Sequence, residues 1–118
     1  MEKKKDTIVS EECQGQIRAL SDTMDLLSGK WKLIILGTLL RSGTMRFMEL
    51  KRSLSGIAPK KLSKDLQDLE LNELVRREVM NTKPITVEYS ITEHGRTLDH
   101  LIGEAIVWGL KHRKEIIK

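Results

Sequence analysis

A change in hydrophobic spacing midway along the chain most restricts its fold. Leu62, Leu66 and Leu69 recur at intervals of four and three residues, as they do on one face of an amphipathic helix. Residues 85–91 instead carry apolar side chains at every second position, which is typical of a strand with one buried face. An NTKP segment with turn-forming residues precedes this strand. The sequence therefore predicts a helix followed by a β-hairpin over about residues 74–91.

Basic residues cluster on the exposed side of this helix, which is predicted over residues 59–71 and begins at a proline. At about 100° per residue, Lys60, Lys64 and Gln67 lie opposite the leucines. Lys61 lies on one flank. The three lysines fall in the first two turns, where the helix dipole favours acidic side chains instead. This unfavourable placement suggests that an anion outside the chain binds there.

The excess of positive charge is confined to the middle of the chain. Residues 30–64 hold nine Lys and Arg against one acidic residue, Glu49, which gives a net charge of +8. Residues 1–29 and 65–118 each have a net charge of −2. Charged runs are ordinarily solvated surface, but segregation this sharp favours a surface that faces a polyanion. Aromatic residues make up only 3% of the chain, which argues against a stacking platform for single-stranded nucleic acid.

Three further helices are predicted before the basic helix. The first follows a polar leader, residues 1–13, and shows one apolar face from Ile17 to Leu27. The second lies in KWKLIILGTLLRSG and is apolar enough to be central in the core. Gly37 lies inside it and predicts the close approach of another helix. The third lies in MRFMELKRSLSG.

A single long helix is predicted over residues 92–118, with Thr92 as its N-cap. Its apolar side chains cover more than one face, so it needs more than one packing partner. The second partner is either another subunit or the first helix of the same chain. The predicted dimer-interface residues are Ile17, Leu20, Leu98, Leu101, Ile102, Ala105, Ile106 and Trp108.

The order of these elements predicts a winged helix-turn-helix. It is mainly α with a small β-hairpin wing, and it spans residues 1–118 as a single domain. In such a fold the second helix of the turn enters the major groove, and the wing lies along the backbone or minor groove. Dimerisation is expected through the N- and C-terminal helices.

The predicted DNA-binding residues fall into three groups. They comprise groove contacts at Lys60, Lys61, Ser63, Lys64 and Gln67, phosphate contacts at Arg46, Lys51 and Arg52, and wing contacts at Arg76, Arg77, Thr82 and Lys83. Gln67 can pair with adenine through two hydrogen bonds, and a lysine can reach guanine O6 or N7. Lys61, on the flank, is expected to be a plain phosphate contact. Phosphate contacts would supply most of the affinity and make it salt-dependent.

The chain resembles the HxlR-type transcriptional regulators, a bacterial family within the MarR-like winged-helix group. The resemblance rests on GKWKLIIL, RFMEL, GIAPKKLSKDLQDLE, PITVEYSIT and WGLKH, which occur in the family's order. It implies a cytoplasmic homodimer that binds double-stranded operator DNA. One departure is Ala58, where the family commonly has Ser or Thr before the recognition helix. The helix then lacks a side-chain N-cap, a loss of roughly 1 kcal/mol.

Cys13 is the one cysteine and a candidate redox residue. Several members of the resembled family carry an N-terminal cysteine, often followed by proline, that senses oxidants or electrophiles. Here Gln14 follows the cysteine, and Glu11 and Glu12 disfavour the reactive thiolate form. A thiol without function and a redox switch both remain open.

Other functional classes find little support in the sequence. His94, His100 and His112 are six and twelve residues apart, which is not the spacing of a helical metal site. No nucleophile–base pattern or phosphate-binding glycine loop occurs, so neither an enzyme nor a cofactor is expected. No apolar run is long enough to span a membrane and no secretory signal is present, so a cytoplasmic protein is expected. The alternative function is a winged-helix module that binds a protein instead of DNA. The operator, the target genes and any effector are left open.

Overall fold

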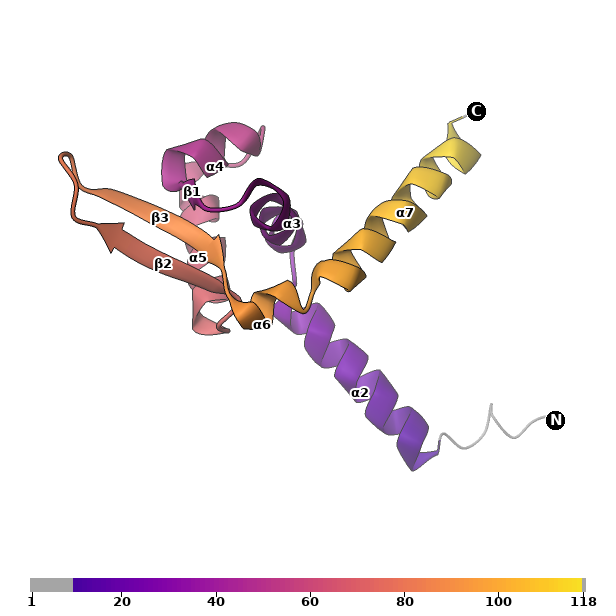
Figure 1. Ribbon diagram of the computed structural model, residues 1–118. Helices are drawn as coiled ribbons and strands as arrows, with labels where there is room; N and C mark the ends of the chain where they lie inside the picture. The colour runs from indigo at the N-terminus through magenta and orange to yellow at the C-terminus, as the bar shows by residue number, and fades with distance from the viewer. Residues whose placement is uncertain (1–9, 118) are drawn as a thin grey trace.

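The computed structural model describes residues 10–117, so most of the predicted leader lies outside the described residues. A three-stranded sheet and its helices form the body, and two long helices, α2 and α7, extend from it on the side away from the hairpin (Figure 1). The architecture is a mainly helical winged helix-turn-helix, as predicted. No helix among residues 10–117 is both long and apolar enough to cross a membrane.

Helix α2 (Glu11–Leu26) includes the last three residues of the predicted polar leader. Ser10 caps it, because its hydroxyl accepts a hydrogen bond of 3.0 Å from the Cys13 backbone N–H. Glu11 and Glu12 lie in the first turn, where negative charge is favourable. None of the residues of α2 is buried.

The segment between α3 (Lys32–Ser42) and α4 (Phe47–Ser53) contains a short strand, β1 (Met45–Arg46). The predicted two-stranded hairpin is therefore a three-stranded antiparallel sheet, with the order β1-β3-β2. Strand β1 pairs Met45 with Tyr89 of β3 (Thr86–Ile91). A strand of two residues leaves too short a pattern to be seen in the sequence.

Helix α5 (Pro59–Leu71) has the predicted bounds and buries the predicted leucines. Its N-cap residue, Ala58, is extended and makes no side-chain capping bond. Asp65 is also buried on this helix, which was not predicted.

The hairpin strands β2 (Val75–Met80) and β3 pair antiparallel along six residue pairs, from Val75 opposite Ile91 to Met80 opposite Thr86. Val75, Tyr89 and Ile91 are buried and share one face, so the predicted alternation is confirmed at this end of the hairpin. Near the turn it is not, because Val79 and Ile85 are exposed.

The long C-terminal helix was predicted wrongly as continuous, because it divides into α6 (Glu93–Arg96) and α7 (Asp99–Ile116). Gly95 lies so close to Leu74 that an added Cβ would overlap the Leu74 carbonyl oxygen. Thr92 reinforces this contact, since its hydroxyl donates to the Glu73 carbonyl at 2.6 Å and accepts from the Gly95 N–H at 2.9 Å. The chain is thus held against β2 and turns before α7 begins.

The core lies between α3, α5 and the sheet, with Ile35, Leu36 and Leu39 of α3 almost fully enclosed. Helix α7 contributes Ile102, whose Cγ2 lies 3.5 Å from the position of a Cβ on Gly37. The helix beside Gly37 is therefore α7, but a Cβ at this position would make only an ordinary contact, so the approach is less close than predicted.

Candidate nucleic-acid interface

A shallow hollow of about 330 Å³ lies between the exposed face of α5 and strand β2. It is lined by Ser63, Gln67, Glu70, Arg77 and Tyr89. Three of these five residues, Ser63, Gln67 and Arg77, were predicted to contact DNA. Arg77 is directly opposite the buried Tyr89 and so lies on the face of the sheet that lines this hollow. The structure therefore brings the three predicted side chains together.

The predicted wing residues lie on both faces of the sheet and in the turn of the hairpin. Arg76 pairs with Ser90, and Arg77 pairs with Tyr89, so the two arginines lie on opposite faces of the sheet. Only Arg77 faces the hollow beside α5. The Thr82 hydroxyl donates to the Pro84 carbonyl at 2.8 Å and so holds the turn of the hairpin.

The face of the wing that carries Arg76 also bears two acidic residues that sequence reasoning did not consider. Glu78 and Glu88 are directly opposite each other, and Arg46 of β1 is opposite Glu88 on the other side. Like charges in directly opposed positions destabilise a sheet. Strict alternation along the strands would have predicted the split of the arginines. The pairing of Glu78 with Glu88 depends in addition on the register of the two strands.

The three basic residues expected to hold phosphates lie near α4. Arg46 and Arg52 line a second hollow that also includes Ile85 and Thr86 of the hairpin. Lys51 is half-buried. Arg46 is also the N-cap residue of α4, and its backbone N–H donates to the Glu49 carboxylate at 2.8 Å.

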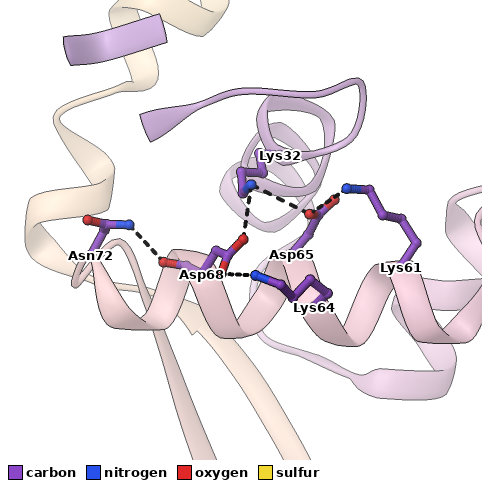
Figure 2. A network of polar contacts seen from close by, with 6 residues as sticks. All are labelled: Lys32, Lys61, Lys64, Asp65, Asp68 and Asn72. Carbon is purple, nitrogen blue, oxygen red and sulfur yellow. Dashed lines mark hydrogen bonds and ion pairs between the residues drawn. The ribbon is translucent and has the colours of Figure 1, made fainter. Parts of the chain in front are cut away.

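A network of charged side chains joins α3 to α5 (Figure 2). Lys32, the first residue of α3, lies 3.6 Å from Asp65 Oδ1 and 3.2 Å from Asp68 Oδ2. Lys61 lies 3.1 Å from Asp65 Oδ1, and Lys64 lies 2.8 Å from Asp68 Oδ1. Each carboxylate is therefore shared by one ammonium group of α3 and one of α5.

The network lowers the pKa of the Asp68 carboxyl below its ordinary value. The largest cause is the hydrogen bond from Lys64, followed by the hydrogen bond from Lys32. Both ammonium groups favour the ionised carboxylate. Asp68 is thus held as an anion on the flank of α5.

These contacts compensate the charge of two of the three lysines near the start of α5 within the chain. Lys61 and Lys64 each have an aspartate four residues later on the same helix, and both pairs form. Within the described residues, Lys60 makes no ion pair. The i, i+4 spacing was visible in the sequence. The contribution of Lys32 was not, since its residue number is remote from those of both aspartates.

The predicted dimer-interface residues are mostly exposed in the single chain. Ile17 and Leu20 of α2, and Leu101, Ala105, Ile106 and Trp108 of α7, all have solvent-exposed side chains. Leu98 and Ile102 differ, because they pack against the chain's own core. The sequence could not separate these two groups, since α7 is apolar on both sides.

The remaining candidate residues form no further constellation. Cys13 is exposed in the first turn of α2. Across residues 10–117, no three His, Cys, Asp or Glu side chains lie close enough together to hold a metal ion.

The comparisons with known proteins agree on one family. The family model described as "HxlR-like helix-turn-helix" matches residues 26–116. YdzF, an HTH-type transcriptional regulator of Bacillus subtilis, is 39% identical over 98 residues, which are 83% of this chain and 90% of the relative. An HTH-type transcriptional regulator of Halalkalibacterium halodurans is 36% identical over 107 residues, which are 86% of this chain and 95% of the relative.

Solved structures show the same likeness. The redox regulator HypR in its reduced form superposes with a TM-score of 0.77 at 36% identity, over 83% of this chain and 96% of that chain. Each of these relatives is a regulator.

Proposed function

Since the chain belongs to the HxlR-like helix-turn-helix family and is a DNA-binding transcriptional regulator, we propose which of its side chains carry DNA recognition. Helix α5 enters the major groove, and the hairpin of β2 and β3 lies along the backbone or minor groove. The family does not favour the alternative of a module that binds only protein.

The observation that supports this docking most directly is the hollow shared by α5 and β2. Ser63 and Gln67 present hydrogen-bonding groups from the helix, and Arg77 presents a guanidinium group from the wing. Gln67 suits a bidentate contact to adenine, and Arg77 suits a phosphate or guanine. Lys60 is exposed, with no ion pair among the described residues, and is free to contact DNA at once.

Additional phosphate contacts are assigned to Lys51, Arg52 and Arg46 near α4 and to Lys83 at the hairpin turn. Lys61 and Lys64 are also assigned to phosphates, although each must first leave its aspartate. Arg76 is given a smaller role than the sequence suggested, because it shares its face of the sheet with Glu78 and Glu88.

We further propose a cytoplasmic homodimer that forms through α2 and α7. The support is the exposed apolar surface of these two helices, which includes Leu20 and Trp108. Large apolar patches on soluble proteins commonly mark interfaces. A two-fold dimer would bind a pseudo-palindrome with half-sites about one or two helical turns apart.

The docking is tested by selecting bound fragments from a random duplex pool and then measuring variants on the selected duplex. Lys60→Glu is expected to weaken binding at least tenfold, and Gln67→Ala to relax the preference at one base pair. Lys114→Glu, at an exposed position in the last turn of α7, is the matched charge control and should leave affinity unchanged. Equal affinities for all three variants and the wild type would show that α5 does not dock in the groove.

Cys13 remains the candidate position for a redox signal, because it is exposed and the similar HypR is a redox regulator. A diamide titration of DNA affinity, with Cys13→Ser as control, tests this role. Unchanged affinity in the wild type would assign Cys13 no regulatory function.

A further inference from the structure

Lys32 is a buried lysine whose only charged partners among the described residues lie on α5. Its exposed fraction is 7%, and it contacts both Asp65 and Asp68. A buried ammonium group is costly unless it is closely paired. The cost of burying the Lys32 ammonium group at the start of α3 is therefore offset by these two carboxylates.

Lys32 in turn offsets the negative charge of both carboxylates. Asp65 is almost completely buried, and neither of its carboxylate oxygens has a hydrogen-bond partner among residues 10–117. Its charge is offset by two nearby ammonium groups, those of Lys61 and Lys32. If Lys61 moved away without Lys32 in place, a buried anion would be left uncompensated.

The same two carboxylates hold lysines that lie on the DNA-facing helix. The side chains of Lys61 and Lys64 are 46% and 63% exposed, so both can swing outward. A phosphate must compete with Asp65 for Lys61 and with Asp68 for Lys64. The outcome of that competition depends on how well each carboxylate is neutralised after its lysine has left.

We propose that Lys32 is a positioning residue for DNA binding, which holds Asp65 and Asp68 from α3 so that Lys61 and Lys64 can transfer to phosphates. It also fixes α5 on α3 while this exchange takes place. The proposal rests on the docking described under Proposed function.

The test separates this role from a purely structural one through the salt dependence of binding. Each phosphate contact adds about 0.9 to the slope of log affinity against log salt concentration. A residue that only stabilises the fold would lower the melting temperature without changing this slope. The measurement uses the full chain, the selected duplex and fluorescence anisotropy at several salt concentrations.

Lys32→Met, which keeps an unbranched side chain one atom shorter but removes its charge, is expected to lower affinity about tenfold and to reduce the slope by about 1 to 2. In this variant Lys61 and Lys64 stay on their aspartates. The double variant Lys32→Met with Asp68→Asn should recover about half of the lost slope, because Lys64 is released. Lys32→Arg should keep the wild-type slope. A slope unchanged by Lys32→Met would overturn the proposal.

Two further variants keep the test decisive if Lys32→Met does not fold by circular dichroism. Lys64→Gln should reduce the slope by about 0.9. Asp68→Asn alone should leave it unchanged, because Lys64 already leaves Asp68 in the wild type. A slope that rises with Asp68→Asn, or does not fall with Lys64→Gln, contradicts the proposal.

Failure of the docking itself gives a different pattern. In that case Lys60→Glu and Gln67→Ala also leave DNA binding unaltered. If they weaken binding while the Lys32 and Lys64 variants keep the full slope, the docking stands and only the role of Lys32 is wrong.

Discussion

The ammonium group of Lys61 lies 3.1 Å from a carboxylate oxygen of Asp65, whose side chain is almost completely enclosed. Lys60, the preceding residue, has no ion pair among the described residues. Two adjacent lysines in the first turn of α5 therefore differ in their contacts within the chain. One stabilises the fold in the free protein, and the other is available to DNA.

Lys61→Ala is expected to lower the free energy of unfolding by about 1 kcal/mol. The value is well below that for a fully buried pair, because Lys61 is half exposed and Lys32 stays beside Asp65. Lys60→Ala removes the same side chain one position earlier and should change stability by less than about 0.5 kcal/mol. Urea denaturation at one fixed protein concentration measures both. Equal effects would show that the Lys61–Asp65 pair contributes nothing.

The parts of the fold predicted from the sequence are those set by local pattern. The bounds of α5 follow from leucine spacing and Pro59, and the hairpin follows from alternation over residues 85–91. The parts that were missed depend on residues far apart in the chain. Strand β1 exists only because Met45 meets Tyr89, and the break before α7 exists because Gly95 packs on Leu74.

The candidate site shows the same division. Its basic surface was predicted from charge segregation, since nine Lys and Arg fall within residues 30–64. The burial of Lys32 was not, because an isolated lysine in an apolar run gives no sign of its partner. Pairing across helices requires the fold, whereas the pairs within α5 needed only a count of four residues.

The stability of the protein should respond to acid partly through Asp68. Its pKa lies below the ordinary value of 3.8 in the folded state, owing first to Lys64 and then to Lys32. A carboxyl with a lowered pKa stabilises the fold above its unfolded pKa, and this stabilisation is lost as the pH falls through the folded pKa. The contribution of Asp68 is therefore complete at neutral pH and declines below about pH 3.8.

Asp68→Asn should accordingly lose less stability than the wild type between about pH 4 and pH 2. Asp22→Asn serves as the control, because Asp22 is exposed on α2 and has no ion pair among residues 10–117. Unfolding followed by circular dichroism across this range gives the comparison. Parallel curves for Asp68→Asn and the wild type would show that the network does not stabilise the fold.

Two glycines are expected to respond oppositely to alanine. At Gly95 an added methyl group overlaps the Leu74 carbonyl oxygen and lies close to Ile91, so Gly95→Ala should destabilise the protein by about 2 kcal/mol or more. At Gly37 the new Cβ meets Ile102 at 3.5 Å, an ordinary contact, and alanine favours the helix. Gly37→Ala should therefore stabilise by about 0.5 kcal/mol. Thermal unfolding of both variants tests the contrast, and a stable Gly95→Ala would refute the packing.

A side-chain N-cap at Ala58, the residue before α5, should increase the stability of this helix. Ala58 has the extended backbone of an N-cap, with φ −76° and ψ 145°, but no side chain that can accept a hydrogen bond. Ala58→Ser should add about 1 kcal/mol of stability by capping a free N–H group of the first turn. Ala58→Val, which cannot accept a hydrogen bond, is the control. If serine and valine give the same unfolding free energy, the cap does not form.

The exposed apolar face of α2 provides the test of the proposed dimer. Leu20 is 58% exposed in the single chain, so Leu20→Glu should leave each chain folded while it places a charge in the subunit interface. Ala19→Glu adds the same charge about 100° away on the helix, farther from the stripe that Leu20 shares with Ile17 and Met24. In sedimentation at micromolar concentration, the wild type and Ala19→Glu are expected to be dimers and Leu20→Glu a monomer. DNA affinity of Leu20→Glu should fall in parallel, because one subunit reaches only one half-site. A wild type that sediments as a monomer would show instead that α2 and α7 do not form a dimer at this concentration.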